Sequence, residues 1–145
     1  MSKFIAFAVV ALALGCNSRP SESKVTEKVP AAEQHLAEMS VPAVAAALKD
    51  KKVVAVDANG AETREKYGVV PGALLLTDHR SYALTELPAD KSSSLVFYCG
   101  GTKCRASDAA ATRAAAAGYA SVSVMRDGIR GWVDAGQATT SAPKS

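Results

Sequence analysis

Short apolar runs alternate with helical patterns through the middle of the chain. Four runs of aliphatic and aromatic residues are candidate strands, at residues 53–56, 72–76, 95–98 and 122–125. Runs that are apolar throughout are typical of strands buried on both faces of a parallel sheet. Four other segments have helical patterns, at residues 43–48, 62–67, 107–117 and 129–135. Strands that alternate with helices predict a single α/β domain with a central parallel sheet flanked by helices.

Residues 1–15 have the pattern of a secretory signal peptide. Lys3 supplies a positive charge, and residues 4–14 are apolar or small,. This run is too short to cross a hydrocarbon core, which needs roughly 20 helical residues. The sequence Ala-Leu-Gly-Cys that ends at Cys16 resembles the lipobox of bacterial lipoproteins, in which the cysteine is lipidated. We therefore expect an exported protein that a lipid on Cys16 anchors to a bacterial membrane. Asn17 in place of Asp favours the outer membrane, facing the periplasm, and an ordinary cleaved signal is the alternative.

Polar segments flank the predicted domain. Residues 16–38 begin with the cysteine expected to be lipidated and continue as a segment rich in Ser, Glu, Lys and Thr. Such a composition predicts a flexible tether. Residues 139–145 are small and polar, and we expect a disordered tail there,. The folded domain is therefore expected at residues 39–138.

Composition narrows the classes of function. The chain has 145 residues, of which 48% are hydrophobic, so it can form one core and is not disordered throughout,. The formal net charge of +3 is too small to indicate a polyanionic partner, and 6% aromatic residues argue against base stacking,. No nucleic-acid partner is expected. Three cysteines cannot build a disulfide framework, so each needs its own explanation,.

The strongest chemical signal is the loop that joins the third apolar run to the next helix. It starts at Cys99 and continues through Gly100, Gly101, Thr102, Lys103, Cys104 and Arg105. Ligands of open α/β sheets bind at the carboxyl ends of the strands, and glycines let backbone amides turn towards an anion. The helix N-terminus, Lys103 and Arg105 add positive charge, which would favour the nucleophilic thiolate of Cys99. We therefore expect Cys99 to be catalytic and residues 100–105 to bind an anion. The alternative is an inert buried cysteine.

These motifs resemble those of the rhodanese-like family over nearly all of residues 39–138. The matching pieces, in order, are Asp57-Ala58-Asn59 for an Asp-Val-Arg motif, residues 68–73 for a Gly-His-Ile-Pro-Gly-Ala turn without its histidine, Cys99 for the catalytic cysteine, and residues 127–132 for a closing Gly-Gly-x-x-x-Trp motif. The resemblance implies a single rhodanese-like domain and a sulfurtransferase. Cys99 would take sulfane sulfur from a small anionic donor such as thiosulfate, and the amides of residues 100–105 would stabilise the persulfide. The acceptor would be cyanide or a thiol, and neither cofactor nor metal is implied.

Two features of the loop leave other functions open. Five residues separate Cys99 from Arg105, one more than in the usual sulfurtransferase loop, and this spacing resembles the phosphatase branch of the fold. A phosphatase or arsenate reductase is therefore one alternative, although Tyr98 stands where that branch usually has His. Cys104 could form a disulfide with Cys99, resolve a persulfide, or face the core as a small residue. The other alternative is accordingly a non-catalytic redox or partner-binding module that uses these two cysteines.

Overall fold

The computed structural model describes residues 36–143. The expected signal peptide, Cys16 and most of the expected tether lie outside the described residues. The elements, in chain order, are β1 (Ala37–Glu38), α1 (Val41–Lys49), β2 (Val54–Asp57), α2 (Ala61–Tyr67), β3 (Leu74–Leu75), the short 3-10 helix η1 (Leu84–Glu86), β4 (Ser94–Tyr98), α3 (Ala106–Ala116), β5 (Ser121–Met125) and α4 (Gly128–Asp134). None of the helices within the described range is long and apolar enough to cross a membrane.

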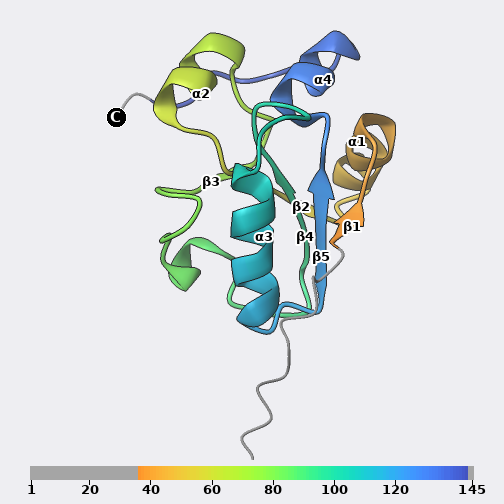
Figure 1. The fold of residues 1–145 in the computed structure, drawn as a ribbon. Helices are drawn as coiled ribbons and strands as arrows, with labels where there is room; N and C mark the ends of the chain where they lie inside the picture. The colour runs from red at the N-terminus through yellow and green to blue at the C-terminus, as the bar shows by residue number, and fades with distance from the viewer. Residues whose placement is uncertain (1–35, 144–145) are drawn as a thin grey trace, which may run out of the picture. The chain divides into compact units, whose positions relative to one another are not determined.

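The strands form one parallel sheet in the order β1-β5-β4-β2-β3 (Figure 1). Its central register pairs Asp57 with Tyr98 and Tyr98 with Met125, so that three neighbouring strands end level with one another. The segments that follow β2, β4 and β5 therefore meet at the carboxyl edge of the sheet, where open α/β folds bind ligands. The predicted fold class, a parallel sheet flanked by helices, is confirmed.

Strand β4 is buried on both faces, as its apolar sequence predicts. Leu95, Phe97 and Cys99 pack in the cluster that includes the buried alanines of α3, whereas Val96 and Tyr98 pack in the cluster formed with α1 and α4. This alternation follows from the two-residue period of a strand. Figure 1 shows α3 on one side of the sheet and α1 on the other. Cys99 consequently lies on the α3 side of the sheet.

The alanine-rich sequence of α3 suits its position against the sheet. Ala110, Ala111 and Ala114 are fully buried, and their spacing places them on one face of the helix,. Alanine has the highest helix propensity, and its small side chain lets the helix lie close to the strands. The helix thus holds its N-terminus close to the end of β4, which supplies Cys99.

The described residues make backbone pairings beyond the predicted domain at both ends. Within the expected tether, β1 pairs with β5, and the amide of Met39 donates to the carbonyl of Val124 at 2.9 Å. Within the expected tail, Thr140 and Val69 exchange two backbone hydrogen bonds of 2.9 and 3.0 Å. Both additions satisfy backbone groups at the rim of the domain. They involve too few residues to leave a hydrophobic period in the sequence.

Candidate active site

Cys99 lies at the end of β4 and is bonded to Cys104. Cys99 is only 2% exposed, and the Cα atoms of the two cysteines are 6.3 Å apart, a normal separation for a disulfide,. The buried Ser107, in the first turn of α3, places its Oγ 3.3 Å from the Sγ of Cys99. The structure therefore shows the oxidised state of the predicted nucleophile, with a hydroxyl beside its sulfur.

The start of α4 holds the loop after Cys99 through backbone hydrogen bonds. The amide of Ile129 donates to the carbonyl of Cys99 at 2.8 Å, and the amide of Arg130 donates to the carbonyl of Gly100 at 3.3 Å. Gly128 has a φ of +60°, and a Cβ added there would lie 2.6 Å from the amide nitrogen of Gly101. Only glycine permits so close an approach between these two backbone segments. The motif that begins with Asp127 thus positions the Cys99 loop.

Most amides of the loop donate no hydrogen bond to the described part of the protein. Counting acceptors within residues 36–143, the amides of Gly100, Gly101, Thr102 and Lys103 donate no hydrogen bond, whereas the amide of Cys104 donates to the carbonyl of Gly101 at 2.8 Å. No side chain caps the N-terminus of α3, so its first amides also remain open,. Open amides next to a helix N-terminus stabilise negative charge.

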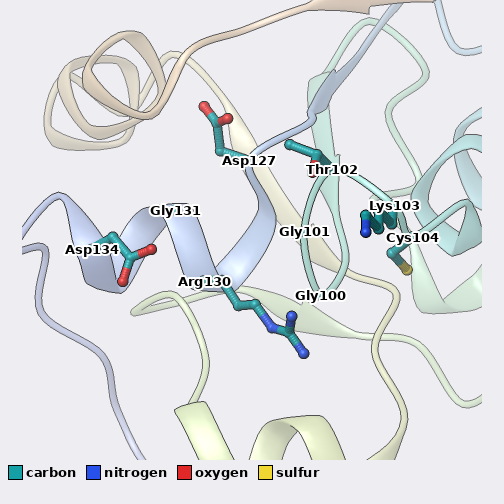
Figure 2. Close-up of a pocket in the computed structure, with 9 residues that line it drawn as sticks. All are labelled: Gly100, Gly101, Thr102, Lys103, Cys104, Asp127, Arg130, Gly131 and Asp134. Carbon is teal, nitrogen blue, oxygen red and sulfur yellow. The ribbon is translucent and has the colours of Figure 1, made fainter.

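A cavity of about 600 Å³ lies against this loop (Figure 2). It is lined by Gly100, Gly101, Thr102, Lys103 and Cys104 from the loop, and by Asp127, Arg130, Gly131 and Asp134 from the start of α4 and its following turns. The predicted binding residues 100–104 therefore share one cavity. Two cations, Lys103 and Arg130, face it together with two carboxylates. Over the described range, no group of three or more His, Cys, Asp or Glu side chains could hold a metal ion.

Arg130, Asp127 and Asp134 were not expected as site residues. The sequence places the first two in a motif that was interpreted only as a fold signature, and α4 brings them to the cavity because β4 and β5 end level. Figure 2 shows the Arg130 side chain extending from α4 beside the loop. A Cβ on Gly101 would lie 3.6 Å from the Cδ of Arg130, so the two segments are in contact. The signal that could have identified Arg130 is its position in the first turn of the helix that follows β5, a strand that neighbours β4.

Arg105 lies apart from this cavity. Its side chain is 74% exposed, and its Nη1 lies 3.2 Å from Oδ2 of Asp108, one turn further along α3. Arg126 donates to the same Asp108 oxygen at 2.7 Å. Asp108 therefore holds both guanidinium groups on the outer side of the helix N-terminus. Of the two cations predicted to flank Cys99, the structure brings Lys103 to the cavity and turns Arg105 away from it.

A buried ion pair stabilises the neighbouring end of β2. The Asp57 carboxylate is fully buried, and its Oδ1 accepts hydrogen bonds from Nε of Arg64 at 3.2 Å and from the amide of Asn59 at 2.7 Å. Next to it, the hydroxyl of Tyr98 accepts a hydrogen bond from the amide of Val70 at 3.0 Å. Burial, reinforced by the charge of Asp57, raises the pKa of Tyr98. The residue before Cys99 is thereby fixed as a neutral phenol. Arg64, which the sequence analysis did not single out, compensates the buried carboxylate.

Comparison with solved structures shows the same fold in several proteins. A thiosulfate sulfurtransferase from Pseudomonas aeruginosa has 23% identity and a TM-score of 0.62, with 78% of this chain and 22% of that chain covered. A human single-domain sulfurtransferase has 19% identity and a TM-score of 0.52, with 67% and 95% covered. A Rhodopseudomonas palustris protein described as a possible tyrosine phosphatase has 24% identity and a TM-score of 0.57, with 72% and 85% covered. These likenesses concern the fold alone.

A family model built from sequences identifies the family of this chain. No curated protein has a significant sequence match to this chain. The family model described as a rhodanese-like domain matches residues 40–135, which include β4, the Cys99 loop and all of α4. The resemblance inferred from the four short motifs is confirmed, and the chain belongs to the rhodanese-like domain family.

Proposed function

We propose that this protein is a sulfurtransferase that carries sulfane sulfur as a persulfide on Cys99. The donor is a small anion such as thiosulfate, and the acceptor is a thiol or cyanide. The observation that carries this proposal is the position of Cys99 at the end of a buried strand, beneath a loop whose amides are open. Family membership and the two sulfurtransferases of the same fold support it.

The first half-reaction needs Cys99 as a thiolate, so the disulfide with Cys104 must first be reduced by an external thiol. The Cys99 thiolate then attacks the outer sulfur of thiosulfate. One sulfur–sulfur bond forms, the bond within thiosulfate breaks, and sulfite leaves with the electron pair. An acceptor thiolate then attacks the outer sulfur of the persulfide, takes it, and returns Cys99 to the thiolate.

The surroundings of Cys99 favour the anionic species in this sequence. The open amides of Gly100–Lys103 and the uncapped N-terminus of α3 offer donors to a thiolate or persulfide,. The hydroxyl of Ser107 is placed to donate to the Cys99 sulfur. Lys103 and Arg130 line the cavity and would attract an anionic donor. Arg105 is given no contact with the donor in this proposal, because Asp108 holds it outside the cavity.

The test is formation of thiocyanate from thiosulfate and cyanide by the reduced protein. We expect turnover by the parent and by Arg105→Gln, which changes a cation outside the cavity. Turnover should fall to background in Cys99→Ser and several-fold in Arg130→Gln. Equal turnover by Cys99→Ser and the parent would overturn the proposed mechanism.

A redox module without catalysis is the second candidate, favoured by the disulfide between Cys99 and Cys104. In that case the loop would change its partner-binding surface with the oxidation state, and sulfur donors would leave the protein unmodified. Counting free thiols and bound sulfur after exposure to thiosulfate separates the two candidates. Loss of two thiols on mild oxidation, with no sulfite release on addition of thiosulfate, would favour the module.

A phosphatase or arsenate reductase is less well supported. That chemistry uses an arginine to grip the oxygens of the substrate in a bidentate manner. Arg105 has the spacing for this role, yet its side chain is 74% exposed and paired with Asp108. Hydrolysis of a generic aryl phosphate that is lost in Arg105→Lys would reverse this judgement.

We also propose that the domain is exported and anchored by a lipid on Cys16. The support is the signal-like sequence of residues 1–15. Two acyl chains on one residue suffice for stable anchoring, whereas one chain does not. Expression in a bacterial host with labelled fatty acid should label the parent and leave Cys16→Ser unlabelled. Incorporation of equal label into both would refute the anchor.

A further inference from the structure

We propose that Cys104 ends the reaction by releasing the transferred sulfur as hydrosulfide, which makes the domain a thiosulfate reductase that depends on an external thiol. This inference rests on the proposed persulfide chemistry of Cys99 and assigns its outcome. The sulfane sulfur would leave as the reduced product, and the two cysteines would remain as a disulfide. An external thiol would then restore the active form.

The geometry places Cys104 where a resolving thiol must be. The Cα atoms of Cys99 and Cys104 are 6.3 Å apart, and the two sulfurs are joined with β4, α3 and α4 in their packed positions. The turn that carries Cys104 is closed by the hydrogen bond from its amide to the carbonyl of Gly101 at 2.8 Å. The folded loop therefore accommodates a bond between the two sulfurs.

The step balances in atoms and electrons. The thiolate of Cys104 attacks the inner sulfur of the persulfide, which is the Sγ of Cys99. A bond forms between the two cysteine sulfurs, the bond to the outer sulfur breaks, and that sulfur leaves with the electron pair. It takes up the proton that the Cys104 thiol gave up when it became the thiolate, and so departs as hydrosulfide. The sulfane sulfur is reduced by two electrons, and the two cysteines are oxidised to the disulfide. Hydrosulfide is a weaker base than an alkyl thiolate, which makes it the better leaving group.

The proximity of Cys104 to the persulfide on Cys99 favours this step over transfer of the sulfur to an external acceptor. Cys104 is tethered five residues from Cys99, and a short tether gives an effective concentration on the order of mM or more,. Cys104 also lines the cavity that an external acceptor would have to enter. An acceptor must therefore compete with a nucleophile that is already in place. Without an external acceptor in excess, we therefore expect the persulfide to end in hydrosulfide release.

The same geometry predicts how the disulfide is reopened. Cys99 is 2% exposed, whereas Cys104 is partly exposed and faces the cavity. An external thiolate therefore reaches the sulfur of Cys104 first and forms a mixed disulfide there, which expels the thiolate of Cys99. The nucleophile is freed in its reactive form while the resolving cysteine is still blocked. A second external thiol then releases Cys104.

The test is a single turnover of the full chain without external thiol. The protein carries Cys16→Ser, so that only Cys99 and Cys104 remain of the three cysteines. It is reduced, desalted under anaerobic conditions and mixed with thiosulfate. Monobromobimane then captures sulfite and hydrosulfide together, and intact mass spectrometry follows bound sulfur and lost thiols. The matched variants are Cys104→Ser and Cys104→Ala, and a sample without thiosulfate controls for oxidation by residual air.

We expect one sulfite and one hydrosulfide per chain, with loss of both thiols, when Cys104 is present. In Cys104→Ser and Cys104→Ala we expect sulfite, no hydrosulfide, and a bound sulfur that cyanide removes. Sulfite together with a stable persulfide in the protein that retains both cysteines would overturn this inference and leave the sulfurtransferase proposal standing. Absence of sulfite from every variant would overturn both.

Discussion

The contact between Gly128 and the Cys99 loop gives a sharp prediction for the variant Gly128→Ala. Gly128 has a φ of +60°, a conformation that costs an L-residue about 1–2 kcal/mol,. The added Cβ would also lie 2.6 Å from the nitrogen of Gly101 and 2.8 Å from the carbonyl carbon of Gly100. These are backbone atoms that cannot rotate away, and overpacking of this kind costs about 1–3 kcal/mol. The expected loss of unfolding free energy is therefore about 2–5 kcal/mol.

Gly136→Ala is the matched control. Gly136 has a similar φ of +73°, with nothing within 4 Å of the added Cβ, so this variant carries only the conformational cost. At roughly 5 °C of Tm per kcal/mol for a domain of this size, we expect Gly136→Ala to lose about 5–10 °C and Gly128→Ala about 10–25 °C. Thermal unfolding monitored by circular dichroism measures both.

The same pair separates stability from function. At a temperature where both variants are folded, Gly136→Ala should release sulfite from thiosulfate at the parent rate. Gly128→Ala should be slower by roughly 100-fold, because a displacement of about 1 Å at a reacting group costs a factor of that order. Equal Tm values and equal sulfite rates for the two variants would refute the claim that α4 positions the loop.

Three further predictions concern groups around the site. Arg64→Met should lose about 3–5 kcal/mol of unfolding free energy, because it leaves the buried carboxylate of Asp57 without its partner,. Lys52→Met, which removes an exposed ion pair, should lose under about 1 kcal/mol,. Urea titration measures both losses, and equal losses would contradict the role of Arg64 as the partner of a buried charge. Burial raises the pKa of Tyr82 to about 12 in the folded state, against about 10 when unfolded, so its contribution to stability is complete below about pH 10 and is lost as the pH rises through about 12,. Between about pH 9 and pH 11.5, the unfolding free energy of Tyr82→Phe should therefore fall by about 1–2 kcal/mol less than that of the parent. Equal falls in the two proteins would argue against this titration. Brief treatment of the oxidised protein with glutathione should give a mixed disulfide on Cys104, mapped by peptide mass spectrometry, and initial modification of its disulfide partner would contradict the order of exposure.

The sequence predicts the sheet and its reactive edge well, because both depend on local patterns. Residues 95–98 of β4 are apolar and are buried on both faces of the sheet. The alanines of α3 lie where a helix must approach a sheet closely. Cys99 follows β4 directly, so its place at the carboxyl edge follows from strand direction alone. The resemblance identifies the motif around Gly128, and the structure shows that this motif makes a backbone contact that only glycine tolerates.

The charges around the site were less predictable, because they depend on how side chains pair across the fold. Arg105 stands in the loop sequence, yet Asp108 attracts it to the outer side of α3. Arg130 comes from another element and reaches the cavity only because β4 and β5 end level. Arg64 compensates Asp57 from seven residues further along the chain.

The β1 pairing escaped prediction for a different reason. Two residues of strand carry no period that could be detected in the sequence, and Ala37 and Glu38 are both exposed. Their pairing is specified by the free edge of β5, which needs partners for its backbone groups,. Sequence patterns report buried faces, whereas this contact is made by backbone pairing and by the ion pair between Glu38 and Arg126.

The most direct test of the central claim is intact mass spectrometry of the reduced Cys104→Ser protein after brief exposure to thiosulfate, with Cys99→Ser measured in parallel. Removal of Cys104 prevents the disulfide and leaves the persulfide as the end product. We predict a gain of one sulfur atom that cyanide removes in Cys104→Ser and no gain in Cys99→Ser. An unchanged mass of Cys104→Ser, or the same gain in both variants, would contradict the assignment of Cys99 as the sulfur carrier.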